Sequence, residues 1–176
     1  SSTGELTGWV SGGSGSGVTR MFVYGQFSQT PTAVGKASSR TSASFARFGT
    51  QTVELRVATS FISSAQAKQN LDLEATGRSF DDVRNAARDA WNARLGVIEV
   101  PNATETQKVT LYSNLSRLNL YPNSQSENTG TADSPVWKYA SPVNATSGSA
   151  TSTTTNAQVN DGQLYVNNGF WDTYRT

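Results

Sequence analysis

The C-terminal residues carry the side chains best suited to chemistry in this sequence. Trp171, Asp172 and Arg175 place an indole, a carboxylate and a guanidinium close together. This group suits a sugar, because an aromatic face can cover the apolar side of the ring while the charged groups bond its hydroxyls. The same spacing also suits a core aromatic beside an i,i+3 surface ion pair between Asp172 and Arg175. The spacing alone leaves both interpretations open.

Acid–base hydrolysis needs two carboxyl groups aimed at one bond, and no convincing pair is visible elsewhere. The remaining candidates lie at helix starts, on a solvated helix face or in polar loops, where capping, the helix dipole and turn formation explain them. They are Asp72, Glu74, Asp81, Asp82, Asp133 and Asp161. The sequence shows neither a calcium-binding Asp-x-Asp-x-Asp-Gly loop nor a glycine-rich phosphate loop. We therefore predict no catalytic residue and no metal ligand in this chain.

Composition excludes several other kinds of site. The 176 residues include no cysteine and no histidine, so Ser-His-Asp, Cys-His and His-ligated metal sites cannot be built from this chain alone. Charged residues make up only 15%, the net charge is +1, and no basic run suggests nucleic acid as a partner. No apolar run in the sequence is long enough to span a membrane.

Three N-glycosylation sequons begin at Asn102, Asn114 and Asn144. Together with polar positions filled by Ser, Thr, Asn and Gly, they favour a secreted, extracellular glycoprotein. The first residues do not form a signal peptide, so the signal is expected to have been removed or to lie upstream.

Residues 1–62 have the pattern of β-strands separated by polar loops. The clearest strand spans residues 52–62, where Val53, Leu55 and Val57 alternate with polar or small residues. This alternation predicts one buried apolar face and one solvated face. Other strands are predicted at residues 5–10, 18–27 and 44–48, with loops at 11–17 and 28–44. Four strands form only part of a two-sheet sandwich, so further strands are expected upstream.

Three helices are predicted from capping boxes, in which a Ser or Thr is followed three residues later by Gln or Asp. The pairs are Ser63 with Gln66, Ser79 with Asp82, and Thr104 with Gln107. The helices are expected to end near Leu73, at Leu95 with Gly96 following, and before Pro122. Phe80, Trp91 and Leu95 belong to an apolar stripe that is expected to dock the second helix. We further predict a short strand at 97–100, mostly loop over 123–161, and a last short strand at 163–166.

Several short sequence blocks follow one another in a recognisable order. They are Ser60-Phe61-Ile62-Ser63-Ser64, Asn70-Leu71 with Glu74, Ala90-Trp91-Asn92 with Leu95, Tyr121-Pro122, and Phe170-Trp171-Asp172-Thr173-Tyr174-Arg175-Thr176. Together they make the chain resemble glycoside hydrolase family 92, the calcium-dependent α-mannosidases. The resemblance covers about residues 52–122 and 161–176, and the C-terminal block is its most specific part.

The resemblance implies an α+β fold that is part of a larger hydrolase. Residues 1–63 would be the later strands of an N-terminal antiparallel β-sandwich, 64–100 a helical linker, and 101–176 the first segment of a catalytic (α/α)6 barrel. The family hydrolyses α-mannosides with inversion, using a Glu acid and an Asp base around a calcium ion. Those carboxylates and most calcium ligands would lie beyond this chain, so the segment alone is expected to be inactive.

By position in the family motif, Trp171 would line the subsite that holds the mannose being released. Asp172 would accept hydrogen bonds from the hydroxyls of this sugar, and Arg175 would hold the site in shape. The implied partners are α-mannoside glycans and the remainder of the catalytic domain, either in the same polypeptide or as a second chain. The sequence departs from the family at residues 111–113 and 124–127, which leaves subclass and linkage preference open. An alternative function is a non-catalytic carbohydrate-binding β-sandwich module, and another is a cell-surface adhesion module.

Overall fold

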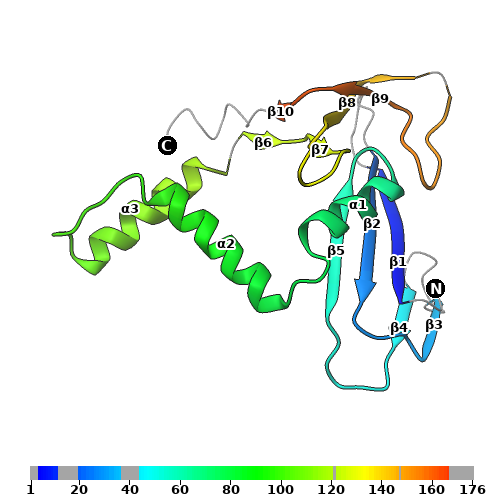
Figure 1. The fold of residues 1–176 in the computed structure, drawn as a ribbon, viewed down its shortest axis with the longest axis horizontal. Helices are drawn as coiled ribbons and strands as arrows, with labels where there is room; N and C mark the ends of the chain where they lie inside the picture. Colours follow the sequence, from blue (N-terminus) through cyan, green and yellow to red (C-terminus); the bar gives the residue numbers. More distant parts are fainter. Residues whose placement is uncertain (1–3, 12–19, 37–43, 121, 147, 167–176) are drawn as a thin grey trace. The chain divides into compact units, whose positions relative to one another are not determined.

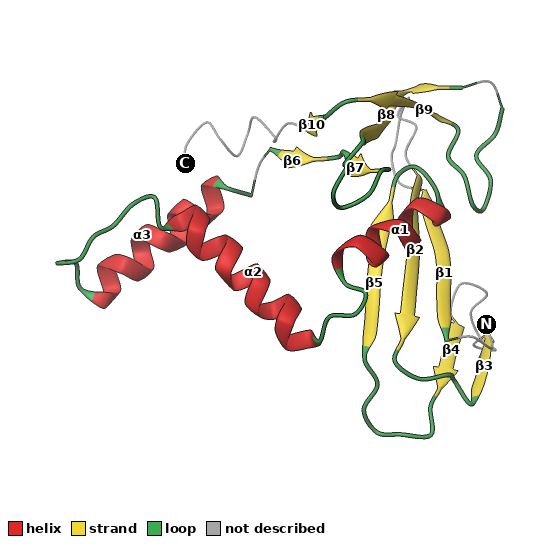
Figure 2. Cartoon of the chain, in the orientation of Figure 1, coloured by secondary structure: helices red, strands yellow, loops and turns green. Residues whose placement is uncertain are grey.

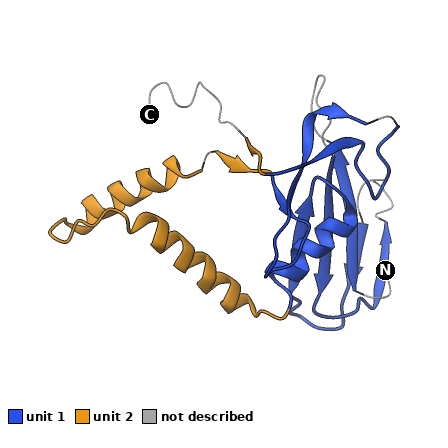
Figure 3. Ribbon diagram, turned by 45° about the horizontal axis from the view of Figure 1, so that its top comes forward, with its two compact units in different colours: residues 1–76, 126–162 blue, residues 77–125, 163–176 orange. Residues whose placement is uncertain are grey.

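The computed structural model describes residues 4–11, 20–36, 44–120, 122–146 and 148–166. The chain divides into two compact units, shown in different colours in Figure 3. Unit 1 contains residues 1–76 and 126–162, and unit 2 contains residues 77–125 and 163–176. The segment boundaries expected at residues 63 and 100 concern domains of a longer protein and stay a prediction.

Unit 1 is built on a three-stranded antiparallel sheet with one helix against it (Figures 1 and 2). The strands are β1 (Glu5–Ser11), β2 (Arg20–Phe27) and β5 (Leu55–Ser60), in the order β1-β2-β5. Helix α1 (Ser64–Glu74) follows β5 directly and packs against β2 and β5. The strands predicted at 5–10, 18–27 and 52–62 and the first predicted helix are therefore confirmed, with bounds shifted by a few residues.

The core of unit 1 lies between α1 and one face of this sheet. Phe22 and Tyr24 of β2 are buried against Ala67 and Leu71 of α1, with Ala58 of β5 packed beside them. Phe22 is fully buried, and it is the largest such side chain among the described residues. The phenol of Tyr24 donates a 2.6 Å hydrogen bond to Glu5 Oε1. Burial, reinforced by this carboxylate, raises the pKa of Tyr24 to about 12.

The predicted burial of β5 is wrong in its direction. The alternation is real, but Ala58 and Ser60 are the residues that lie on the α1 side. Leu55 and Val57 lie on the opposite face of the sheet and remain 43% and 50% exposed. The side with small residues faces α1 because a helix can approach a strand closely where Ala and Ser leave room. A prediction from polarity alone gives the opposite face, which carries Leu55 and Val57, as the buried one.

A small β-hairpin of unit 1 occupies part of the segment that was expected to be a loop. Strand β3 (Ala33–Lys36) pairs antiparallel with β4 (Ser44–Arg47) and places Gly35 opposite Phe45. The Phe45 ring lies directly over Gly35, since a Cβ built there would come within 2.9 Å of ring carbons. The expectation of loop throughout residues 28–44 is therefore wrong for β3, whereas the strand expected at 44–48 is confirmed.

A second three-stranded sheet replaces most of the loop expected over residues 123–161. It contains β7 (Glu127–Asn128), β8 (Trp137–Ala145) and β9 (Ala157–Asp161), all antiparallel. The bridge between Ser63 and Thr154 joins the β8–β9 connection to the start of α1. The expectation of loop is wrong here because these strands are rich in Ser, Asn and Ala, and their hydrogen bonding depends on partners distant in sequence.

Unit 2 contains two capped helices. Helix α2 (Phe80–Leu95) begins with a complete capping box between Ser79 and Asp82, and α3 (Glu105–Leu118) with one between Thr104 and Gln107. These boxes and helices confirm the predictions. No residue of either helix is buried, and Phe80 at the start of the predicted apolar stripe is 68% exposed. No described helix is both long and apolar enough to cross a bilayer.

The connections in unit 2 agree only in part with expectation. The strand predicted at residues 97–100 is wrong, because this segment continues the turn after α2. The Ile98 amide donates a hydrogen bond to the Leu95 carbonyl, and the Ile98 carbonyl accepts one from Tyr112 Oη. Strand β10 (Tyr165–Val166) confirms the last predicted strand. It pairs with β6 (Asn123–Ser124), which follows Pro122. The whole is an α+β structure with antiparallel sheets, as predicted.

Candidate functional site

The predicted sugar-contacting residues Trp171, Asp172 and Arg175 lie outside the described residues, so their roles stay a prediction. The structure does define the strand that leads toward them. In β10, Tyr165 lies opposite Ser124 and Val166 lies opposite Asn123 of β6. The Gln125 amide donates a 2.9 Å hydrogen bond to the Leu164 carbonyl. The chain before the C-terminal block is therefore held by a short antiparallel ladder that starts just after Pro122.

Many of the described carboxylates are engaged with nearby cations or amides. The ion pairs of the described residues join groups that are close along the chain or lie on paired strands, and they are Arg56–Glu54, Lys68–Asp72, Arg84–Asp81, Arg88–Asp89, Lys108–Glu105 and Lys138–Asp161. These exposed pairs are structural features of low energetic value. Among the described residues, none of these pairs brings two carboxyl groups together as an acid and a base would require.

The pKa values of the Asp72 and Asp82 carboxyl groups are both displaced downward. The pKa of Asp72 is lowered chiefly by its hydrogen bond with Lys68, with a further bond from Thr76. The pKa of Asp82 is lowered by the Ser79 hydroxyl and the Ser79 amide, which form the capping box. A general acid needs a raised pKa, so these two carboxylates are unsuited to that role.

The described part of the chain holds no group of three or more Asp or Glu residues that could bind a metal ion. The calcium ion implied by the family resemblance therefore has no fitting ligand set among those residues. The expectation that most of its ligands lie elsewhere stays a prediction.

A polar network fixes the segment around Glu127 to helix α1. The Glu127 carboxylate accepts a 2.8 Å hydrogen bond from the Phe61 amide and a 2.9 Å hydrogen bond from Asn70 Nδ2. Gln66 Nε2 donates to Asn70 Oδ1 and to the Asn128 carbonyl, both at 2.9 Å. Glu127 therefore positions β7 against α1 and the end of β5. The network also explains why Ser63 and Gln66 form only half of the predicted box, since the Gln66 side chain is used here.

Sequence reasoning did not find this network. Gln66, Gln69 and Asn70 share one face of α1 at i, i+3 and i+4 spacing, and this polar stripe was the available indication. Its partner lies about 60 residues away: Gln69 Nε2 donates 2.7 Å to the Gly130 carbonyl. No local pattern identifies that partner.

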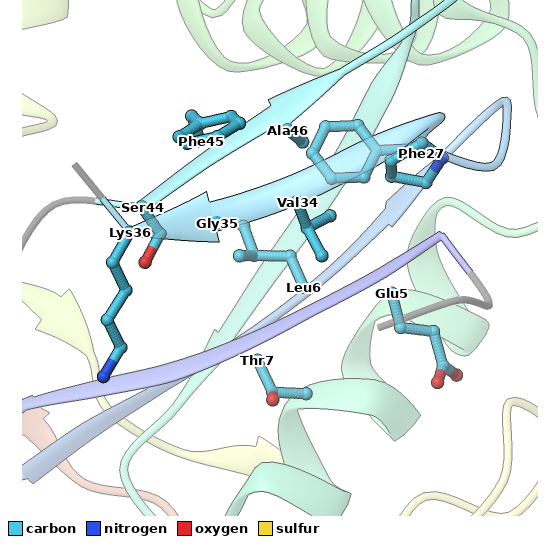
Figure 4. Close-up of a pocket in the computed structure, with 11 residues that line it drawn as sticks. Glu5, Leu6, Thr7, Phe27, Val34, Gly35, Lys36, Ser44, Phe45 and Ala46 are labelled. Carbon is cyan, nitrogen blue, oxygen red and sulfur yellow. The ribbon is translucent and has the colours of Figure 1, made fainter. Parts of the chain in front are cut away.

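Unit 1 carries an apolar groove between β1 and the β3–β4 hairpin (Figure 4). Leu6 and Val34 lie side by side there, with Phe27 near Ala46, and the space amounts to about 520 Å³. Glu5 and Thr7 extend from the opposite side of the β1 ribbon in this view. The described lining is mainly apolar, with Glu5, Thr7, Lys36 and Ser44 as its polar residues, so the groove favours packing of an apolar group.

A second groove, in unit 2, combines aromatic and polar groups. It lies where α2, α3 and β10 meet and has a volume of about 480 Å³. Its lining residues are Ala90, Trp91, Arg94, Leu118, Asn119, Pro122 and Tyr165. The sequence pattern predicts that Trp91 packs within the apolar stripe of α2, yet its side chain is 42% exposed.

The three sequon asparagines are all exposed, although their settings differ. Asn102 lies in the turn before α3, and the hydroxyl of its sequon residue Thr104 caps that helix. Asn114 lies within α3 and accepts 2.9 Å from Arg117, whereas Asn144 lies on β8. Exposure makes the asparagines accessible, and glycosylation of each stays a prediction.

Comparison with known proteins places these features in a family of enzymes that act on glycosidic bonds. The family described as the glycosyl hydrolase family 92 catalytic domain matches residues 66–176, which is more than half of the chain. The chain therefore belongs to glycosyl hydrolase family 92. This confirms the resemblance drawn from the sequence blocks.

A solved structure supports the same relationship. It is the family 92 inverting mannosidase from Bacteroides thetaiotaomicron VPI-5482, to which the chain is similar with a TM-score of 0.78 and 26% identity. The match covers 98% of this chain but only 24% of that chain, so the present residues span about a quarter of its length. No curated protein matches the sequence.

Proposed function

We propose that this chain is part of an exo-acting α-mannosidase that hydrolyses α-mannosides, with α-1,2 or related glycan linkages, by inversion. The observation that carries the proposal is the family match, which extends to residue 176 and so includes Trp171, Asp172 and Arg175. The similarity to an inverting mannosidase supports the stereochemical outcome.

The architecture proposed for the whole enzyme is an N-terminal β-sandwich, a helical linker and a catalytic (α/α)6 barrel. Sheet β1-β2-β5 would contribute to the sandwich, and α3 would be the first helix of the barrel. The apolar face that carries Leu55 and Val57 supports a sandwich, since sheets of this kind bury such a face against a second sheet.

The chemistry proposed is a single displacement. One carboxylic acid protonates the departing glycosidic oxygen while a carboxylate activates a water molecule on the opposite face of the sugar. The described carboxylates offer no such pair, so we place both groups outside the described residues. Trp171 would cover the apolar face of the mannose, Asp172 would accept from its hydroxyls, and Arg175 would hold the site in shape. This chain would thus contribute to substrate binding rather than to proton transfer.

The remaining parts of the proposal rest on the family and on the sequons. The family is calcium-dependent, and we place the ligands of the ion mainly outside this chain. Exposed Asn102, Asn114 and Asn144 support a secreted glycoprotein.

The test compares the complete polypeptide with residues 1–176 alone. We expect the complete polypeptide to release mannose from α-1,2-mannobiose, with the β-anomer appearing first in proton NMR, and residues 1–176 to release none. Trp171→Ala in the complete polypeptide should lower kcat/KM by about 100-fold, because the sugar loses its orientation. Trp137→Ala, a half-exposed tryptophan on β8, is the matched control and should leave kcat/KM unchanged.

Two results would contradict the proposal. Turnover by purified residues 1–176 would place the acid and base within this chain. Binding of mannosides by the complete polypeptide without any hydrolysis would instead favour the carbohydrate-binding module, which the aromatic residues alone also permit.

A further inference from the structure

The groove of unit 2 presents two aromatic side chains that are open to a ligand. Trp91 near the end of α2 and Tyr165 of β10 both line it, and they are 42% and 60% exposed. Exposed aromatic rings provide flat apolar surfaces of the size of a pyranose ring, whose C–H face packs against such surfaces. Leu118 and Pro122 complete an apolar wall. A groove of about 480 Å³ is within the range of small-ligand sites.

The same groove holds donors and acceptors in fixed positions. Arg94 Nε donates 2.7 Å to Asn119 Oδ1, and Asn119 Nδ2 in turn donates 2.8 Å to the Leu115 carbonyl at the end of α3. This chain of bonds orients the guanidinium, and its terminal nitrogens make no hydrogen bond to another described residue. Those N–H groups can donate to hydroxyls or to a ring oxygen. Tyr165 donates its own hydrogen to Gln163 and keeps lone pairs that can accept.

The charge of the groove selects among ligands. Among the described residues that line the groove, Arg94 is the only cation and none carries a carboxylate, so a cationic ligand is disfavoured. Aromatic faces combined with a few oriented donors suit a neutral ring that carries several hydroxyls. An apolar chain segment would leave the guanidinium without a partner for its terminal nitrogens.

We propose that this groove is a second saccharide-binding site, which takes a neutral pyranose unit of a mannose-containing glycan. Trp91 and Tyr165 would pack against the ring while Arg94, held by Asn119, bonds its hydroxyls. The choice of mannose rests on the proposed function, whereas the pyranose class rests on the groove itself. The residues are distinct from Trp171, Asp172 and Arg175, so the two sites can be tested separately.

The test is a titration of the ¹⁵N-labelled 176-residue chain with α-1,2-mannobiose, followed at the indole N–H resonances of its four tryptophans. Single Trp→Phe variants assign each resonance. We expect the Trp91 resonance to shift and to saturate with a dissociation constant of about 1 mM. Arg94→Ala should weaken binding by about fivefold or more. Arg88→Ala removes the same charge from another face of α2, where Arg88 pairs with Asp89, and should leave binding unchanged.

Two ligand and variant controls separate this proposal from the proposed function. Sorbitol has the hydroxyls but no ring, so it should not produce a saturable shift. In the Trp171→Ala chain the Trp91 response should persist, because the proposed binding uses Trp91, Tyr165 and Arg94 and does not draw on Trp171.

The groove proposal is overturned if the Trp91 resonance stays unmoved up to about 20 mM mannobiose. It is equally overturned if sorbitol acts like mannobiose or if Arg94→Ala and Arg88→Ala weaken binding alike. Mannoside hydrolysis by the complete polypeptide, together with no shift of the Trp91 resonance, would overturn the groove proposal and leave the proposed function standing. A shifted Trp91 without any hydrolysis by the complete polypeptide would support the groove and overturn the proposed activity.

Discussion

Unit 1 and unit 2 are stabilised by different kinds of interaction. In unit 1, helix α1 buries Ala67 and Leu71 against Phe22 and Tyr24, and a polar network ties it to β7. In unit 2, helices α2 and α3 have complete capping boxes and surface ion pairs but no buried residue. The elements of unit 1 therefore depend on tertiary packing, whereas the helices of unit 2 are specified mainly by local sequence.

This difference separates two questions that a sequence pattern answers with unequal success. Whether a helix forms is decided largely by residues within a few positions, as at Ser79 and Thr104. Which face is buried is decided by what packs against it, as at Leu55 and Phe80. Substitutions in the two units should accordingly differ in size and in character.

The largest expected effect is at Phe22, which is fully buried beneath α1. Phe22→Ala should lower the free energy of unfolding of unit 1 by about 3–5 kcal/mol, because it leaves a cavity between β2 and α1. Urea unfolding followed by near-ultraviolet circular dichroism measures the change. Phe80→Ala is the control from unit 2, where the ring is 68% exposed, and should cost less than about 1 kcal/mol. Equal losses at the two positions would remove the contrast between the units.

A backbone contact in unit 1 gives the next effect. A Cβ built on Gly130 would lie 2.3 Å from the Ser134 carbonyl oxygen and 2.8 Å from the Val136 amide nitrogen. Gly130→Ala should therefore cost about 1–3 kcal/mol in urea unfolding, since the backbone must shift to admit the methyl group. Gly8→Ala has no atom within 4 Å of the added Cβ and should be nearly neutral. A neutral Gly130→Ala would show that the 130–136 turn adapts without loss.

The polar network should respond to the loss of a single acceptor. Glu127→Gln leaves one oxygen for the Phe61 amide but turns an amide donor toward Asn70 Nδ2. We expect unit 1 to lose about 1–2 kcal/mol, measured by urea unfolding. Glu105→Gln, an exposed acid on α3 that pairs with Lys108, is the matched control and should change stability by less than about 0.5 kcal/mol. A loss at Glu105 as large as that at Glu127 would contradict the role assigned to the network.

Much of the fold follows from the sequence, and the exceptions have physical causes. The helices at 64–74, 80–95 and 105–118 and the strand at 165–166 are predictable because caps and short-range patterns specify them. Strands β8 and β9 are not, because their polar residues have no clear period and their pairing is long-range.

The candidate site divides in the same way. The C-terminal block indicates the family through residue type and order, and the family match confirms the family, whereas the sugar-contacting roles of its residues stay a prediction. The groove with Trp91, Arg94 and Tyr165 could not be foreseen, because the three side chains come from two elements that are about 70 residues apart. Their proximity is a property of the fold and has no local trace in the sequence.

The capping boxes provide a smaller effect that differs between the units in character. Ser79→Ala removes the acceptor for the Asp82 amide and should destabilise α2 by about 1 kcal/mol, because the first turn loses its cap. Amide hydrogen exchange should show faster exchange confined to the start of α2. Ser63→Ala removes the equivalent bond in α1, but packing against β2 and β5 should keep its first turn protected. Equal fraying in both helices would mean that packing does not compensate for a lost cap.

The smallest effect concerns the exposed Lys68–Asp72 pair of α1, in which Nζ lies 2.6 Å from Oδ2. The folded-state pKa of Asp72 is lowered, so its stabilising contribution is present above the unfolded-state pKa and is lost as the pH falls through the folded-state value. The free energy of unfolding of Asp72→Asn should therefore fall below that of the parent chain by less than about 0.5 kcal/mol at pH 7 and match it near pH 2. Urea unfolding across this range, with Asp133→Asn as the control, measures the gap. A gap that widens on acidification would reverse the sign of the proposed linkage, because only a raised folded-state pKa stabilises the protein more in acid than at neutral pH.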